Sequence, residues 1–91
     1  MYLHIGGGTV IREEDIVGVF DLDNTSTSHL TRQFLSAAEK GGQVINAAED
    51  IPKSFIVCSD GDKRRVYLSQ MSTQTLLARV RNELRGLSFE L

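Results

Sequence analysis

A tight turn between two strand-like segments constrains the fold of this chain more than any other feature. Residues 54–59 (SFIVCS) form its most apolar short run, residues 64–69 (RRVYLS) form a second run, and Asp60-Gly61-Asp62 lies between them. Such a turn is typical of a β-hairpin, because aspartate and glycine tolerate the backbone angles that a chain reversal needs. We therefore expect the two segments to lie side by side and antiparallel, which excludes a purely parallel sheet.

The remaining elements follow from the spacing of apolar residues. Helical spacing predicts one helix over residues 28–39, ended by Gly41-Gly42, and a second helix that begins after a capping Ser72. Apolar runs predict strands at residues 2–5, 9–11, 16–20, 44–45, 54–59 and 64–69. Because residues 16–20 are apolar almost throughout, we expect that strand to be central in the sheet. The expected fold class is α+β, a mostly antiparallel β-sheet with two α-helices packed on it.

The length and composition of the chain limit the class of protein. We expect a single domain over residues 1–91, with residues 82–91 as a tail. The hydrophobic content of 41% and the charged content of 24% are typical of a soluble globular protein. No apolar run approaches the roughly 20 residues of a membrane span, and no secretory signal is recognisable. Together with the single Cys58, which excludes a disulfide framework, these features predict a cytoplasmic protein without a membrane partner.

One segment is similar to a catalytic motif. In residues 19–25 (VFDLDNT), Asp21 and Asp23 have the spacing of the two carboxylates in haloacid-dehalogenase-type phosphatases. That family implies a longer, doubly wound parallel sheet, with which the hairpin at residues 60–62 is incompatible, and no acidic pair follows that could hold magnesium. We therefore interpret the two aspartates as part of a turn before a helix, and we predict no enzymatic activity, no catalytic residue, no metal site and no cofactor.

Other single residues with possible chemistry have simpler interpretations. His4 and His29 have no neighbour at metal-ligand spacing, so we interpret both as structural or surface residues. Cys58 lies in an apolar strand and is expected to be an inert buried thiol. Residues 6–8 (GGG) precede no helix start and indicate a flexible hairpin turn.

Basic side chains are unevenly distributed, although the formal net charge is −2. Lys63, Arg64 and Arg65 are consecutive and follow the predicted hairpin turn. Such a run is either a charged edge that prevents strand-to-strand aggregation or a contact for phosphate groups. The acidic balance argues against a uniformly basic surface, but it allows a local basic patch.

Several segments, in order along the chain, resemble the RemA/RemB family of bacterial extracellular-matrix regulators, and the RemB branch in particular. They are Met1-Tyr2 with His4 and Gly6, Asp15-Ile16-Val17-Gly18 with Phe20-Asp21, Pro52-Lys53-Ser54 with Ile56-Val57, and Tyr67-Leu68-Ser69 with Ser72-Thr73. The resemblance covers about residues 1–82. It implies a small transcription regulator of biofilm-matrix genes and, as in the RemA branch, ring-like homo-oligomers that bind double-stranded DNA through repeated basic contacts.

The candidate DNA contacts cannot be copied directly from the RemA branch. That branch has arginines at positions occupied here by Asp15 and by Ile51-Pro52. An aspartate repels phosphate and an isoleucine carries no charge, so the candidates that remain are Lys53, Arg64 and Arg65, followed by Arg12. Contacts of this type position a protein on the DNA backbone and do not read the base sequence. The alternative is a non-DNA-binding oligomeric scaffold or protein-interaction module of the same fold.

Overall fold

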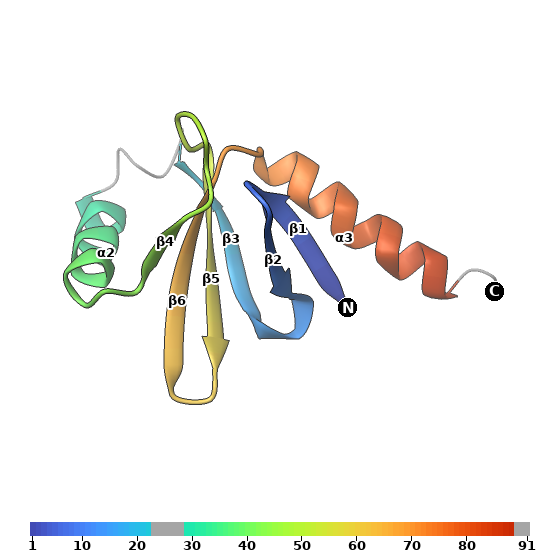
Figure 1. Ribbon diagram of the computed structural model, residues 1–91, viewed down its shortest axis with the longest axis horizontal. Coiled ribbons are helices and arrows are strands. Elements are labelled where there is room, and N and C mark those ends of the chain that lie inside the picture. The colour runs from blue at the N-terminus through green and yellow to red at the C-terminus, as the bar shows by residue number, and fades with distance from the viewer. Residues whose placement is uncertain (23–28, 89–91) are drawn as a thin grey trace.

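The chain folds as an α+β domain, as predicted (Figure 1). The computed structural model describes residues 1–22 and 29–88, with side chains described as far as residue 80. In this part of the chain the elements are β1 (Tyr2–Gly6), β2 (Thr9–Arg12), the 3₁₀ helix η1 (Glu13–Asp15), β3 (Ile16–Asp21), α2 (His29–Lys40), β4 (Val44–Asn46), β5 (Ser54–Asp60), β6 (Lys63–Ser69) and α3 (Thr73–Ser88). The predicted helices and strands are therefore confirmed to within a few residues at their ends.

The strands form two sheets. β1 and β2 pair as an antiparallel hairpin, and a four-stranded sheet has the order β3-β5-β6-β4. β5 pairs antiparallel with both β3 and β6, whereas β4 pairs parallel with β6. The predicted hairpin at residues 60–62 is confirmed, with Asp60 opposite Lys63 and Gly61 at a positive φ of 62°. The sheet is thus mostly antiparallel, and its centre is the β5–β6 hairpin.

The expectation that residues 16–20 form a central strand is wrong, because β3 is an edge strand of its sheet. Its apolar character has another cause: layers of the protein lie on both faces of the sheet. Ile16 and Val19 pack into the core on one face. On the other face Phe20 stacks on Phe55, with ring centroids 5.0 Å apart. An edge strand with neighbours on both faces is as apolar as a central one.

The strand alternation of β5 separates two hydrophobic cores. Ile56 and Cys58 point to the face covered by the β1–β2 hairpin and α3, which we call the hairpin face. Phe55 and Val57 point to the face covered by α2, which we call the α2 face. Figure 1 shows α2 on one side of the sheet and the β1–β2 hairpin with α3 on the other. The fold therefore has three layers with the four-stranded sheet in the middle.

Buried serine hydroxyls join the layers. Ser69 is fully buried, donates a hydrogen bond to the carbonyl oxygen of Ile5 at 2.7 Å and accepts one from the backbone N–H of Met71 at 3.1 Å. Ser54, also fully buried, donates to the carbonyl oxygen of Met71 at 2.8 Å. Each bond satisfies a polar group that would otherwise be costly to bury. They connect β1 and the start of α3 to the sheet.

The ends of the helices follow the predicted signals. At the end of α2 the backbone N–H of Gln43 donates to the carbonyl oxygen of Ala38 at 2.9 Å. At the start of α3, the hydroxyl of Ser72 accepts a hydrogen bond from the N–H of Thr75 at 3.1 Å, as expected of a capping residue. Leu76 is fully buried, whereas its neighbour Leu77 is 46% exposed.

Candidate nucleic-acid interface

The basic run Lys63, Arg64 and Arg65 begins β6 directly after the hairpin turn. All three residues are exposed, and among the described residues none of them forms an ion pair. Strand alternation directs Lys63 and Arg65 to the hairpin face and Arg64 to the α2 face. The start of β6 therefore presents exposed positive charge on both faces of the sheet, held on a paired β-hairpin.

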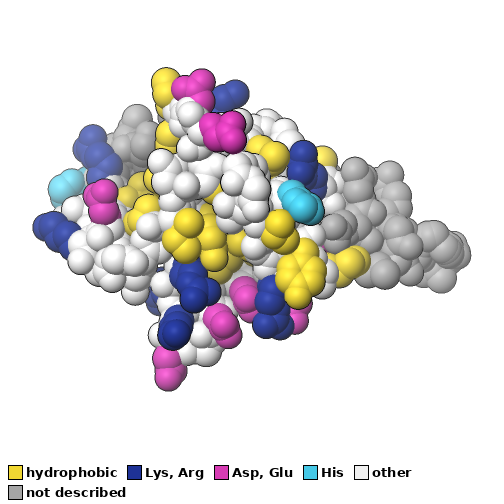
Figure 2. Space-filling view, viewed as in Figure 1, with side chains coloured by type: hydrophobic (Ala, Val, Ile, Leu, Met, Phe, Trp, Pro, Cys, Tyr) yellow, Lys and Arg dark blue, Asp and Glu magenta, His cyan; other side chains and the backbone are white. Residues whose placement is uncertain are grey.

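On the hairpin face the structure brings two of the predicted residues together. Arg12 and Arg65, with Lys63, line a shallow hollow that also contains the carboxylates of Asp15 and Asp60. Three cations thus meet two anions within one small area. Figure 2 shows dark blue and magenta side chains interleaved over the lower part of the molecule, where Figure 1 places the β5–β6 turn. The positive charge of this hollow is partly balanced within the chain.

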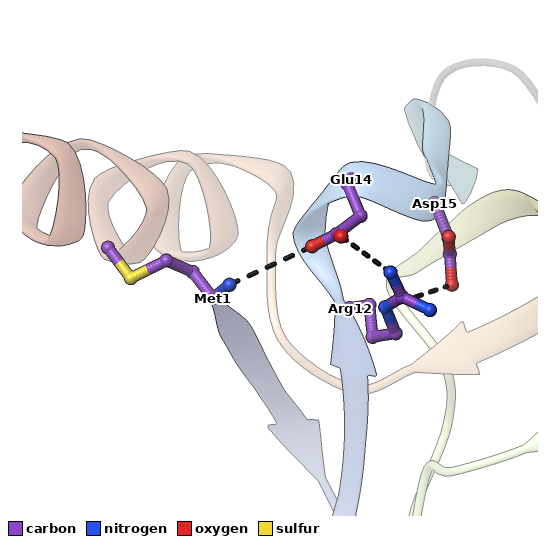
Figure 3. Close-up of polar contacts among 4 residues, drawn as sticks. All are labelled: Met1, Arg12, Glu14 and Asp15. Atoms are coloured by element: carbon purple, nitrogen blue, oxygen red, sulfur yellow. Dashed lines mark hydrogen bonds and ion pairs between the residues drawn. The ribbon is translucent and has the colours of Figure 1, made fainter.

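Arg12 is the most strongly compensated of the predicted residues (Figure 3). Its guanidinium donates a hydrogen bond to Glu14, and its Nε lies 3.9 Å from Oδ2 of Asp15. The hydrogen bond and the charge of Glu14 raise the pKa of Arg12, and the same pair lowers the pKa of Glu14. Glu14 also lies 3.8 Å from the terminal amine of Met1. A phosphate would have to compete with these carboxylates for Arg12.

Lys53 is distant from the other predicted contacts. It precedes β5, where its backbone N–H donates to the carbonyl oxygen of Ser69 at 2.8 Å. Arg64 and Arg65 lie toward the opposite end of the same hairpin. With a rise of about 3.3 Å per residue, the length of β5 puts about 20 Å between the two ends. The residues proposed from the sequence as one set therefore belong to two separate places.

A basic stripe on α2 lies outside the residues predicted from the sequence. His29, Arg32 and Lys40 line a shallow surface hollow along the exposed side of this helix, with Gln33, Ser36 and Ala37 between them. The signal was present in the spacing of residues 29, 32, 36 and 40, which places them on one side of a helix. The apolar residues of α2 predict the helix, and the same helical spacing gathers its basic residues on the opposite, exposed side.

The comparisons with known proteins address the identity of the fold. A family model described as RemA-like, extracellular matrix regulatory protein A-like, matches residues 2–80. The chain is also 32% identical over 79 residues to extracellular matrix regulatory protein B of Bacillus subtilis (strain 168), which covers 87% of this chain and 89% of that protein. The chain belongs to the RemA-like family.

Membership of the RemA-like family confirms the resemblance found in the sequence, over residues 2–80. The family is described as one of extracellular-matrix regulatory proteins, and it is not a known enzyme family. The identity with extracellular matrix regulatory protein B supports the assignment to the RemB side of the family.

Asp21 and Cys58, two residues with possible catalytic chemistry, both lie on strands of the four-stranded sheet. Asp21 ends β3 and is in register with Ser54 of the antiparallel strand β5, and Asp23 lies outside the described residues. Cys58 is buried, as predicted, and burial raises the pKa of its thiol to about 11. No group of three potential metal ligands occurs among residues 1–22 and 29–80. In the same part of the chain, no helix has the length and apolar character needed to cross a membrane.

Proposed function

We propose that this RemA-like protein is an oligomeric regulator of extracellular-matrix genes that binds the phosphate backbone of double-stranded DNA. The observation that carries the proposal is the exposed run Lys63-Arg64-Arg65, which has no ion-pair partner among the described residues. The regulatory part of the proposal is supported by the family description. A regulator of this kind acts on DNA and therefore works in the cytoplasm.

The chemistry of the hairpin turn suits phosphate better than bases. Arg64 and Arg65 carry planar guanidinium groups that match phosphate oxygens, and Lys63 adds a point charge. They begin β6 directly after the turn, and Arg64 points to the opposite face of the sheet from Lys63 and Arg65, so the three cannot reach the base edges of one groove together. Contacts of this type fix the position of the protein on the backbone, so sequence preference must come from DNA shape or from the assembly.

Oligomerisation raises the overall DNA affinity of a contact that is weak in a single subunit. A subunit that neutralises two or three phosphates binds DNA weakly at physiological salt. When several linked subunits bind together, each further contact is intramolecular and the overall affinity rises steeply. The second basic position, Lys53, extends the footprint of one subunit, since about 20 Å along the duplex corresponds to about six base pairs at 3.4 Å each. A basic hairpin repeated around an oligomer is therefore sufficient for binding.

A mobility-shift titration on long duplex DNA at low and physiological salt tests the proposal. We expect wild type to bind at low salt and to lose affinity steeply as salt increases. Arg65→Glu should weaken binding by about an order of magnitude or more, since it removes a phosphate contact and adds a repulsive charge. Arg32→Glu on α2 makes the same change of charge on another surface and is the matched control. Absence of binding at low salt, or equal losses in both variants, would contradict the proposed site.

A substitution beside Arg12 should strengthen DNA binding, in contrast to Arg65→Glu, which should weaken it. Glu14→Gln removes the carboxylate that accepts the hydrogen bond from Arg12. If Arg12 belongs to the DNA contact, this variant should bind DNA more tightly than wild type, and the additional Arg12→Gln substitution should abolish the gain. Unchanged affinity in Glu14→Gln would remove Arg12 from the site.

A second candidate function is a non-DNA-binding oligomeric scaffold of the same fold. It is favoured by the net charge of −2 and by the carboxylates of Asp60 and Asp62, which lie on either side of the turn glycine. An oligomer that ignores DNA at every salt concentration would support this function over the first.

A further inference from the structure

An apolar groove runs along the α2 face between α2 and the edge strand β3. It encloses about 460 Å³, and its hydrophobic wall consists of Val17, Phe20, Leu30, Phe34, Phe55 and Val57. Two of these side chains are largely exposed to solvent, Leu30 at 74% and Val17 at 67%. Arg64 is the one charged residue among the described residues that line the groove. A contiguous apolar surface of this kind on a small domain is typical of a protein-binding site.

The loop between β4 and β5 has the complementary character. Ile51 is 79% exposed, the highest value among the large hydrophobic side chains of the described residues, and it follows Glu49 and Asp50. In Figure 1 this loop forms the upper tip of the molecule, and Figure 2 shows hydrophobic, acidic and basic side chains at that tip. The loop is an apolar projection with two carboxylates before Ile51 and Lys53 after it.

Hydrogen bonds hold this projection in place. The side-chain oxygen of Gln70 accepts hydrogen bonds from the backbone N–H groups of Glu49 at 2.8 Å and Asp50 at 3.2 Å. The carboxylate of Asp50 accepts a third from the N–H of Ile51 at 2.8 Å. A loop that is already ordered loses little conformational entropy when a partner binds. Its shape therefore favours recognition by a preformed groove.

We propose that Ile51 of one copy of the chain inserts into the groove between α2 and β3 of a second copy, with Glu49 and Asp50 facing Arg64. The inference rests on the self-association that is part of the proposed function, and it names the surfaces. The match is one of polarity and of charge: an apolar side chain meets an apolar wall, and two carboxylates meet Arg64 at the rim. Ile51 does not line the groove of its own chain, so the two surfaces join different copies.

This contact uses two different surfaces and is heterologous. A pair of subunits joined in this way keeps one free projection and one free groove, so assembly continues until a ring closes or a filament forms. The contact also separates two roles on β6. Arg64 points to the α2 face, so in the assembly the subunit contact takes it away from the phosphate contact, whereas Lys63 and Arg65 point to the hairpin face and remain accessible to phosphate.

Light scattering of the purified full chain without DNA tests the contact. We expect wild type to assemble, and Ile51→Asp and Leu30→Asp to be monomeric, because each puts a carboxylate into the apolar contact. Leu30→Asp should retain its fold, since an acidic residue in the first turn of α2 is favourable for the helix. Leu77→Asp, at a residue that is 46% exposed on α3, is the matched control and should assemble as wild type does. Circular dichroism verifies folding.

Mixing the two monomeric variants tests the direction of the contact. Ile51→Asp retains an intact groove, and Leu30→Asp retains an intact projection, so an equimolar mixture should form dimers and nothing larger. A monomeric wild type, assembly that persists in both variants, or a mixture that stays monomeric would each overturn the inference. Because assembly is measured without DNA, a wild type that assembles but does not shift DNA counts against the proposed function and leaves this contact intact.

Discussion

The two faces of the four-stranded sheet are covered to different degrees, although both are apolar. On the hairpin face, the β1–β2 hairpin and α3 together cover the sheet. Four of the core residues there are each at most 1% exposed: Leu3, Ile5, Ile56 and Leu76. On the α2 face a single helix covers the sheet, and Val17, Phe20 and Leu30 stay exposed beside it. The core on the hairpin face is therefore fully covered by the chain itself, whereas the core on the α2 face leaves apolar side chains exposed at its margin.

This difference indicates how stability and function are divided. Residues of the hairpin face are buried within the monomer, so substitutions there should lower the free energy of unfolding. Residues at the margin of the α2 face gain burial only from a partner, so substitutions there should act on assembly with little effect on the monomer. Four predictions test this division, from the largest expected effect on stability to the smallest.

The largest effect is expected from Ile56→Ala in the centre of the hairpin face. Ile56 is 0% exposed and belongs to the main core cluster. Removing its branched side chain should lower the free energy of unfolding by about 2–5 kcal/mol, because the rigid surroundings leave a cavity. Urea denaturation measures the change. A loss below about 1 kcal/mol, the range of an Ile→Val change, would show that this core is not closed.

Ser69→Ala should have the next largest effect. Its hydroxyl is buried between β6 and β1 and makes two hydrogen bonds with the backbone. The substitution leaves the carbonyl oxygen of Ile5 without this donor, which should cost about 1–3 kcal/mol of unfolding free energy. Ser69→Cys serves as a control that preserves a weak donor. Thermal unfolding of the two variants tests the prediction, and equal stability of Ala, Cys and wild type would contradict it.

Burial of Cys58 on the hairpin face should make the stability of the fold depend on pH. Folding keeps its thiol protonated by raising the pKa from about 9 to about 11. The folded state then binds the proton more tightly than the unfolded state, so the stabilisation is complete below about pH 9 and is lost as pH rises toward 11. Cys58→Ser, which removes the titration, should flatten this dependence. Alkylation of native protein at pH 8 should be slow compared with denatured protein, and equal rates would contradict burial of the thiol.

The smallest effect on stability is expected from Leu30→Ser at the margin of the α2 face. Leu30 is 74% exposed, so the change should alter the unfolding free energy of the monomer by no more than about 0.5 kcal/mol. Assembly should nevertheless weaken. Denaturation at a concentration where wild type is monomeric, compared with light scattering at a higher concentration, separates the two effects. A large loss of monomer stability would show that the two faces are equally closed.

Much of the fold was predictable because it depends on local patterns. The turn chemistry of residues 60–62 was sufficient for the β5–β6 hairpin, and the cap at Ser72 was sufficient for the start of α3. The family resemblance was equally readable, because it depends on the order of short segments along the chain. In each case the decisive residues are neighbours in sequence, or a helix or strand period apart.

The candidate site was only partly predictable, for a physical reason. Lys63-Arg64-Arg65 could be found because the residues are consecutive. The separation of Lys53 from Arg64, by contrast, depends on the strand that lies between them. Arg12 was selected for its charge, and its pairing with Glu14 and Asp15 requires the turn of η1 that brings these side chains together.

The edge position of β3 and the groove beside it show the same limit. An apolar run predicts that a strand has neighbours on both faces. Here the prediction holds, because Ile16 and Val19 pack on one face and Phe20 stacks on Phe55 on the other. It does not state which elements lie above, below or alongside. The sequence alone determines the type and period of each element, since these follow from backbone preferences and side-chain spacing. The tertiary structure decides strand order and the coverage of each face, because these depend on contacts between residues far apart in the chain.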